Sequence, residues 1–302
     1  MRIAITGSSG LVGSELVQYF RRNGHTVSRI MRLGSKLPGG EKVIHWDIDR
    51  RQIDKPALEG MDAIIHLAGA NIAGERWDTD YKRLIYSSRI DSTALITATI
   101  KQLEAKPKVF FSASAVGFYG AAEPEVTLTE DSAPGSDFLA RVCKDWEKTA
   151  SDAEGHTRIV YMRFGTILSQ DGGALTKMLP IFSMGLGGKL GNGKQMMSYI
   201  ALKEIPNILE YILSNDSISG PVNFVTPQPV SNAEFTKALG RVIQRPTIFP
   251  VPSFGVRMMF GEMGDALLLS GAKVMPQRLA HSQYAFQYPT VEAALRASIK
   301  ND

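Results

Sequence analysis

Thr6-Gly7-Ser8-Ser9-Gly10-Leu11-Val12-Gly13 is the stretch that decides the fold of this 302-residue chain. It follows a short apolar run, residues 2–6, and precedes residues 11–23, whose apolar side chains recur at helical spacing. A glycine-rich turn between a strand and a helix is typical of a site that binds a dinucleotide. The alternative is a glycine turn that binds nothing, and the position between strand and helix favours the binding site.

Each glycine of this stretch has a separate physical task. Gly7 permits the tight turn after the strand, Gly10 lets the backbone approach a pyrophosphate, and Gly13 allows the helix to pack closely on the strand. The free N–H groups and the positive dipole end of the helix favour the same anion. The predicted contacts to the cofactor from this stretch are Gly7, Ser9, Gly10, Leu11, Val12 and Gly13.

Strands and helices alternate along the first half of the chain. Apolar runs bounded by turn residues predict strands at 2–6, 26–31, 42–46, 62–67, 108–112 and 158–162. Helical periodicity predicts helices at 11–23, 78–104 and 137–153. This alternation predicts an α/β fold of the Rossmann type, a doubly wound parallel sheet covered by helices on both faces.

The composition of the sequence changes after Gly165, where glycines and then prolines become frequent. Residues 1–165 are predicted to form the dinucleotide-binding domain, and the segment 203–226 is expected to return to its sheet. Residues 166–202 and 227–302 are predicted to form a smaller, mixed C-terminal domain on the substrate side.

The composition excludes several classes of protein. Cys143 is the single cysteine, so an internal disulfide and a multi-thiolate metal site are excluded, and a cytoplasmic protein is expected. The five histidines show no i, i+3 or i, i+4 pairing, so no metal site is predicted. The net charge is +4, but the basic residues are dispersed, which argues against a nucleic-acid partner. No run of about 18 apolar residues predicts a membrane span, and no signal peptide is expected.

The end of the second predicted strand indicates which dinucleotide is bound. A site selective for NAD has an acidic residue near this point, which binds the 2′-hydroxyl of the ribose. Here Met31 occupies the position, Arg32 follows it, and Lys36 is close by. The alternative is that Arg32 is an ordinary solvated charge. Because a guanidinium or ammonium group matches a 2′-phosphate, the sequence favours NADP as cofactor.

At this point the motifs resemble the extended short-chain dehydrogenase/reductase family. Within it, the chain is similar to an atypical subgroup that resembles nucleoside-diphosphate-sugar epimerases and is sometimes labelled cell-division inhibitor. The resemblance covers nearly the whole chain. The motifs are the glycine stretch at 6–13, Ile-His-Leu-Ala-Gly-Ala-Asn at 65–71, Ser-Ala-Ser-Ala-Val-Gly-Phe-Tyr-Gly at 112–120, Asp-Trp-Glu-Lys at 145–148, Arg-Phe-Gly-Thr-Ile-Leu at 163–168 and Gly-Ala-Lys-Val-Met-Pro-Gln-Arg-Leu at 271–279.

The resemblance implies roles for residues at the ends of the predicted strands. Ser114 falls at the catalytic Ser/Thr position, where a hydroxyl forms a hydrogen bond with the substrate oxygen. The alternative for Ser114 is a hydrogen bond to local backbone at the strand end. The implied cofactor contacts, from the adenine toward the nicotinamide, are Asp47, Ile48, Leu67, Ala68, Gly69, Ser112 and Arg163.

One family motif is missing from the chain. Members carry Tyr-x-x-x-Lys on the helix predicted at 137–153: the lysine lowers the tyrosine pKa and holds the ribose, and the tyrosine exchanges the proton. Alignment on Glu147 places Leu139 at the tyrosine position and Cys143 at the lysine position. Lys144 is one residue out of phase, about 100° around the helix. Catalysis by the usual tyrosine is therefore not supported.

Tyr119 and Cys143 are the candidate replacements for the proton donor. Tyr119 lies just after the serine motif, although a Tyr-Gly there is usually structural in the family, and a lone buried thiol is more often inert packing. Tyr199 and Lys203 have the right spacing but lie in a different segment, so the match is a coincidence. Arg89 stands where many relatives carry asparagine, which alters the charge of the site.

Two functions are compatible with these features. The first is an NADP-dependent oxidoreductase or epimerase acting on a small polar or nucleotide-sugar-like molecule, with Ser114, Tyr119 and Cys143 as candidate catalytic residues. The second is a non-catalytic protein that binds NADP(H) as a sensor or interaction module. The resemblance also implies a homodimer formed through the helices at 78–104 and 137–153. The expected partner is a small-molecule substrate, with no nucleic acid and no membrane.

Overall fold

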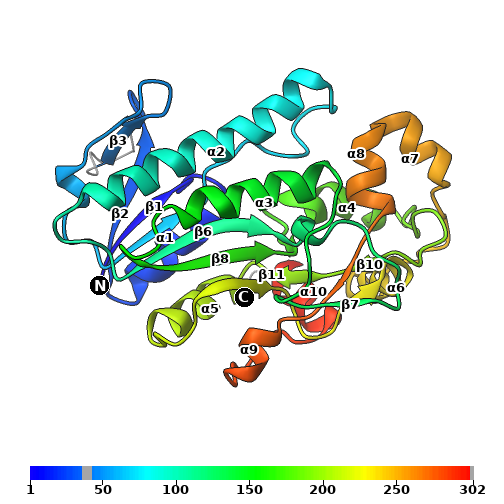
Figure 1. The fold of residues 1–302 in the computed structure, drawn as a ribbon. Coiled ribbons are helices and arrows are strands. Elements are labelled where there is room, and N and C mark those ends of the chain that lie inside the picture. Colours follow the sequence, from blue (N-terminus) through cyan, green and yellow to red (C-terminus); the bar gives the residue numbers. More distant parts are fainter. Residues whose placement is uncertain (36–42, 300–302) are drawn as a thin grey trace.

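A parallel sheet forms the centre of the protein (Figure 1). The computed structural model describes residues 1–35 and 43–299, and within them eight strands pair in the order β12-β8-β6-β5-β1-β2-β3-β4. In this part of the chain every pairing within that sheet is parallel except β3 with β4. The strands are β1 (Arg2–Thr6), β2 (Thr26–Arg32), β3 (Val43–Asp47), β4 (Gln52–Ile53), β5 (Ala63–His66), β6 (Val109–Ala115), β8 (Arg158–Phe164) and β12 (Gly220–Phe224).

Helices cover both faces of this sheet, as the alternation of side chains along each strand requires. Ile3 and Ile5 of β1 point to one face and pack with α1 (Leu11–Arg22) and α5 (Glu204–Leu213). Ala4 points to the other face, toward α2 (Thr79–Gln102) and α3 (Phe138–Ser151), which Figure 1 shows lying side by side. The predicted doubly wound α/β fold is confirmed, and most of the expected element boundaries differ from the observed ones by one or two residues.

The segment 204–224 adds the last helix and strand of the sheet. α5 packs beside α1, and β12 pairs in parallel with β8, with Phe224 opposite Phe164. Glu204, at the start of α5, is fully buried and accepts hydrogen bonds from the Tyr284 hydroxyl at 2.6 Å and the Tyr288 amide at 2.8 Å. These hydrogen bonds attach the segment between α9 and α10 to the start of α5.

The remaining elements lie outside this sheet, and several of them surround another apolar cluster, in the part of the chain where the smaller domain is predicted. Leu175 and Phe182 from α4 pack there with Phe235 and Leu239 from α6 and with Leu295 from α10. The helices are α4 (Gly173–Ser183), α6 (Asn232–Ile243), α7 (Ser253–Phe260), α8 (Glu262–Gly264), α9 (Gln277–His281) and α10 (Val291–Ile299). The strands are β7 (Thr127–Leu128), β9 (Thr166–Leu168), β10 (Met196–Met197), β11 (Tyr199–Ala201), β13 (Val230–Ser231) and β14 (Lys273–Val274). Short single turns are η2 (Pro56–Leu58), η3 (Val116–Tyr119) and the π-helical η4 (Asp265–Leu269).

Gly13 is the position where the packing of α1 on the sheet leaves no room for a side chain. A Cβ there would lie 2.2 Å from the carbonyl oxygen of Gly7 and 2.7 Å from the Cα of Ser8, both of which are backbone atoms. We expect the Gly13→Ala variant to lose about 1–3 kcal/mol of unfolding free energy, because the loop or the helix must move. Urea denaturation of the purified protein measures this loss.

Gly255 in α7 provides the matched control. A Cβ at Gly255 meets no atom within 4 Å, so the Gly255→Ala variant should be as stable as the wild type or more stable by up to about 1 kcal/mol. Equal stability of the Gly13→Ala variant and the wild type would contradict the close packing of α1.

Candidate active site

The loop between β1 and α1 forms a cradle of backbone at the carboxyl edge of the sheet. Gly7 has φ +62°, and a Cβ there would lie 2.9 Å from the carbonyl carbon and oxygen of Leu67. Gly10 is the N-cap of α1, and no side chain of the described residues caps this helix, whereas Asp78 and Asp137 cap α2 and α3. The first amides of α1 are therefore open to an anion, which the helix dipole also favours.

Two buried hydroxyls at this edge have no hydrogen-bond partner among the described residues. Ser8 lies in the glycine loop and is 1% exposed, and Ser112 lies toward the end of β6 and is fully buried. Buried hydroxyls in proteins are normally hydrogen-bonded, so each of the two is suited to a polar group of a ligand. The cradle, the open helix end and these hydroxyls fit a dinucleotide, and the contacts predicted for Gly7, Ser9, Gly10, Leu11, Val12 and Gly13 stay predictions.

A buried chain of polar side chains fixes the ends of β1 and β5 beneath the loop. The Thr6 hydroxyl accepts hydrogen bonds from the amides of Leu67 and Ala68 at 3.0 and 3.2 Å. Its own proton is then directed to His66 Nδ1, 2.8 Å away. His66 Nε2 carries the ring proton in this arrangement and donates to Thr93 Oγ1 at 3.0 Å. The chain holds Leu67 and Ala68 next to the glycine loop.

His66 is neutral in this arrangement. Burial lowers the pKa of its imidazole to about 3, because a charged ring would have to leave water. Trp146 of α3 donates from Nε1 to the same Thr93 hydroxyl at 2.8 Å, so the chain runs from β1 through β5 and α2 to α3. Gly69 follows this fixed segment, and the expected contacts of Leu67, Ala68 and Gly69 with a cofactor stay predictions.

The residues expected at the adenosine end lie at the ends of β2 and β3. Arg32 ends β2 and is exposed, and Asp47 ends β3 and accepts a hydrogen bond from the Arg50 amide at 3.0 Å. Ile48 packs against the apolar cluster under α2. Because parallel strands end at one edge, Arg32 and Asp47 lie on the same edge as the glycine loop. Lys36 lies outside the described residues.

Ser114 is joined to a buried ion pair. Its hydroxyl, 2% exposed, donates to Glu147 Oε1 at 2.6 Å. Arg163 donates to both oxygens of the same carboxylate, from Nε and Nη2, each at 2.8 Å. Ser114 and Arg163 are paired in the register of β6 and β8, and Glu147 reaches them from α3. A two-pronged guanidinium–carboxylate contact of this kind fixes the direction of both groups.

Tyr119 lies on the far side of Arg163 from Ser114. Its hydroxyl accepts a hydrogen bond from Arg163 Nη1 at 2.9 Å and donates to Asn223 Oδ1 at 2.7 Å. Glu130 holds the backbone of Asn223, because Glu130 Oε1 accepts a hydrogen bond from the Asn223 backbone N–H at 3.0 Å. Burial raises the pKa of the Tyr119 hydroxyl, which is 4% exposed. The Tyr119 hydroxyl therefore forms its hydrogen bonds within the protein. The guanidinium of Arg163, which is predicted to contact a cofactor, is likewise hydrogen-bonded to protein groups.

Cys143 and Leu139 are the residues that the alignment on Glu147 predicts at the lysine and tyrosine positions of the family. Burial, together with the charge of Glu147, raises the pKa of the Cys143 thiol to about 12, so the thiol is protonated at neutral pH. Leu139 packs with Phe138 and Met263 in an apolar cluster. Neither side chain has an ionisable group poised for proton exchange.

The sequence prediction did not include Glu147, Glu130 or Asn223 among the site residues. Glu147 served only to align the helix. The signal that pointed to it is Arg163 at the end of an otherwise apolar strand, because a buried arginine needs a carboxylate partner. Asn223 and Glu130 come from segments far apart in the sequence, and no local pattern connects them.

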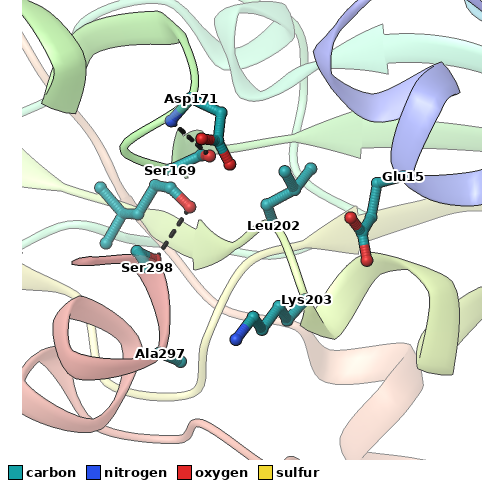
Figure 2. A pocket seen from close by; sticks show the side chains of 8 residues that line it. Glu15, Ser169, Asp171, Leu202, Lys203, Ala297 and Ser298 are labelled. Atoms are coloured by element: carbon teal, nitrogen blue, oxygen red, sulfur yellow. Dashed lines mark hydrogen bonds between the residues drawn. The ribbon is translucent and has the colours of Figure 1, made fainter. Parts of the chain in front are cut away.

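Two cavities of the described chain do not contain these groups. Figure 2 shows a cavity of about 40 Å³ between α1, the segment after β9 and α10, lined by Glu15, Ser169, Asp171, Lys203 and Ser298 among others. Its volume suits about one water molecule. A second, open hollow of about 370 Å³ lies on α6 and the segment after it. The site is therefore identified by its backbone cradle and polar groups.

Residues 1–35 and 43–299 contain neither a cluster of metal ligands nor a membrane-spanning helix. No three side chains of His, Cys, Asp or Glu lie together there as ligands of a metal ion would. In the same residues no helix combines the length and the apolar character needed to cross a bilayer.

Two family models match the chain. Residues 3–224 match the NAD dependent epimerase/dehydratase family, which covers the sheet and all the site residues named above. Residues 251–298 match a domain of unknown function, DUF1731, which covers α7 to most of α10.

Known relatives match over almost the full length. An epimerase family protein of Mycobacterium leprae is 40% identical over 97% of this chain and 94% of its own length. The crystal structure of the human epimerase family protein SDR39U1 with NADPH has a TM-score of 0.89, 30% identity and 99% coverage of both chains. The nucleoside-diphosphate sugar epimerase from Corynebacterium glutamicum has a TM-score of 0.80 and 31% identity, over 99% of this chain and 58% of that one.

The burial of His66 predicts a dependence of stability on pH. The folded pKa of about 3 lies below the value of about 6.5 expected in the unfolded chain, so between these values the unfolded state binds more protons. The unfolding free energy should rise with pH across this window and lose the His66 contribution to the slope above it. In the His66→Gln variant the slope should be smaller by up to about 1.4 kcal/mol per pH unit.

Chemical denaturation at several pH values between about 4 and 7 measures the slope. His281, which is exposed on α9, is the control: the His281→Gln variant should keep the wild-type slope. The same slope in the His66→Gln variant and the wild type would show that His66 is not buried as a neutral ring.

Proposed function

The chain belongs to the NAD dependent epimerase/dehydratase family, and on that premise we propose that it is an NADP(H)-dependent oxidoreductase or epimerase. The resemblance to extended short-chain dehydrogenases/reductases is confirmed by this match and by the SDR39U1 relatives. The observation that carries the proposal is the uncapped N-terminus of α1 behind the Gly7–Gly13 cradle, at the edge where Ser114 also lies.

Two findings support NADP(H) as the cofactor of this chain. Human SDR39U1, a relative with 30% identity over the full length, was solved with NADPH. In this chain Arg32 ends β2 and directly follows Met31, which occupies the position where an acidic residue would bind the unphosphorylated ribose. An exposed guanidinium there is suited to a 2′-phosphate, because charge-assisted bonds to phosphate are the stronger class.

Bound NADP(H) would supply the hydride or accept it. Ser114 then orients the substrate hydroxyl. Because the single proton of Ser114 is donated to Glu147, the lone pairs of its oxygen remain to accept a hydrogen bond from the substrate. As the substrate hydroxyl gives its proton to Ser114 Oγ, the Ser114 proton passes to Glu147 Oε1, so one O–H bond forms for each that breaks. Arg163 holds the carboxylate in place for this transfer.

Tyr119 and Cys143 are less suited to this proton transfer. The pKa of the Cys143 thiol is raised to about 12 and that of the Tyr119 hydroxyl is also raised, in both cases mainly by burial. Neither group is ionised at neutral pH, so neither accepts a proton there. The Ser114–Glu147 pair is therefore the route we propose, with Tyr119 positioning Arg163.

The proposed substrate is a small polar molecule such as a nucleotide sugar. This rests on the nucleoside-diphosphate sugar epimerase from C. glutamicum, which is 31% identical over nearly all of this chain. The second candidate function is a non-catalytic NADP(H) sensor, which Leu139 and Cys143 at the tyrosine and lysine positions favour. The homodimer expected through α2 and α3 stays a prediction.

Turnover distinguishes the two functions. The protein is incubated with NADPH and a panel of carbonyl compounds, and with NADP⁺ and nucleotide sugars, while absorbance of the reduced cofactor and the sugar products are followed. We expect turnover of at least one substrate, and the Ser114→Ala variant should be slower by about 10²–10⁴-fold, the range for loss of a positioned proton-transfer group. Unchanged turnover in that variant would exclude Ser114 from the proton transfer, whereas NADPH binding with no turnover across the panel would favour the non-catalytic sensor.

Arg32 decides the choice between the two nicotinamide dinucleotides. We expect the Arg32→Glu variant to bind NADPH about 10- to 100-fold more weakly, the equivalent of about 1.5–3 kcal/mol for a lost charge-assisted bond. NADH, which lacks the 2′-phosphate, should bind with little change. Isothermal titration calorimetry with both ligands measures the two affinities.

Arg22, exposed in the last turn of α1 at the opposite edge of the sheet, gives a control with the same change in net charge. The Arg22→Glu variant should bind NADPH as the wild type does. An equal loss for NADPH and NADH in the Arg32→Glu variant would remove Arg32 from the 2′-phosphate site.

A further inference from the structure

Arg89 is a partly buried cation that no carboxylate of the described residues pairs with. It lies on α2, donates from Nη1 to the Ile85 carbonyl at 2.9 Å and donates from Nη2 to the Ala70 carbonyl at 3.1 Å. Partial burial lowers the pKa of its guanidinium, and the ionisable groups that act on it are the Cys143 thiol and the Tyr81 hydroxyl. A partly desolvated charge without an opposite charge is unfavourable, so the position is suited to an anionic or strongly polar ligand.

The guanidinium of Arg89 lies between the end of β5 and α3. Its Cζ is 5.1 Å from the centre of the Trp146 ring, and Trp146 follows Cys143 by one helical turn. On the other side, a Cβ on Gly69 would lie 3.3 Å from the same Cζ. Arg89 therefore sits between the segment predicted to line the cofactor and the Cys143 position, where family members carry their ribose-binding lysine.

We propose that Arg89 binds the ribose-phosphate of the nicotinamide half of NADP(H), and so supplies from α2 the cation that relatives supply from α3. The inference rests on the proposed function, because it assumes that the chain binds this dinucleotide. Arginine has five N–H donors. The two carbonyl contacts engage two of them, which leaves three for ribose hydroxyls and a phosphate oxygen.

The stacking on Trp146 and the two carbonyl bonds give this cation a fixed direction. Lysine at the Cys143 position would approach from α3 on a flexible stem, whereas the planar guanidinium is held before any ligand arrives. Less conformational entropy is then lost when the ribose-phosphate binds. Arg89 also lies near the Cys143 thiol, so a lysine at that position would place two cations side by side. The neutral thiol and the partly buried Arg89 are thus compatible with each other.

A pair of ligands tests this assignment without any measurement of activity. NADPH contains both halves of the dinucleotide, whereas 2′,5′-ADP contains only the adenosine half with its 2′-phosphate. In the Arg89→Met variant, NADPH should bind at least tenfold more weakly than it binds to the wild type, and 2′,5′-ADP should bind as before. Calorimetric titration of each ligand gives the affinities, and retained 2′,5′-ADP binding shows that the variant is folded.

Two further variants sharpen the comparison. The Arg89→Lys variant keeps the positive charge but loses the planar set of N–H donors of the guanidinium. Its NADPH affinity should therefore lie between that of the wild type and that of Arg89→Met. Arg83 on the same helix is exposed and pairs with Asp80, and Arg83→Met should leave both affinities unchanged.

Three results would overturn the assignment. An unchanged NADPH affinity in Arg89→Met would show that Arg89 does not contact the cofactor and would leave a substrate anion as its ligand. An equal loss for NADPH and 2′,5′-ADP would show a general disturbance of the site. Failure of the wild type to bind either ligand would refute the proposed function itself, and the wild-type titration identifies that outcome separately.

Discussion

The buried ion pair between Arg163 and Glu147 is the interaction on which the rest of the site depends. Arg163 comes from β8 and Glu147 from α3, and their side chains are only 4% and 11% exposed. Charges buried to this degree stabilise a fold only when their geometry is good and their remaining hydrogen-bonding groups are satisfied. Here Arg163 Cζ lies 3.6 Å from the centre of the Phe118 ring, and Arg163 Nη1 donates to the Tyr119 hydroxyl. The Ser114 hydroxyl donates a further hydrogen bond to the Glu147 carboxylate.

This ion pair joins the sheet to the C-terminal part of the chain and sets the chemistry of the edge. Arg163 contacts Tyr119, whose hydroxyl donates to Asn223 of β12. The side-chain amide of Asn223 in turn donates from Nδ2 to the carbonyl of Met275, just before α9. Toward the cofactor side the ion pair fixes the direction of the Ser114 proton. The site thus has a serine held by a carboxylate, with Arg89 as a second, differently placed cation.

Local patterns predicted the fold, whereas the site required contacts between distant segments. The glycine stretch and the alternation of apolar residues are short-range features, and they gave the sheet, the helices and the cradle at Gly7. Glu147 and Asn223 escaped prediction because their partners lie in other elements and depend on strand register. The surroundings of Arg89 escaped for the same reason, since the sequence showed only an arginine where many relatives carry asparagine.

A crystal structure of the protein with NADPH tests the central claim most directly, because it places each part of the dinucleotide against named residues. We expect the pyrophosphate at the N-terminus of α1, the 2′-phosphate beside Arg32 and the nicotinamide ring beside Ser114, with its ribose-phosphate within hydrogen-bond distance of Arg89. A dinucleotide bound elsewhere, or one whose nicotinamide points away from Ser114, would contradict this arrangement.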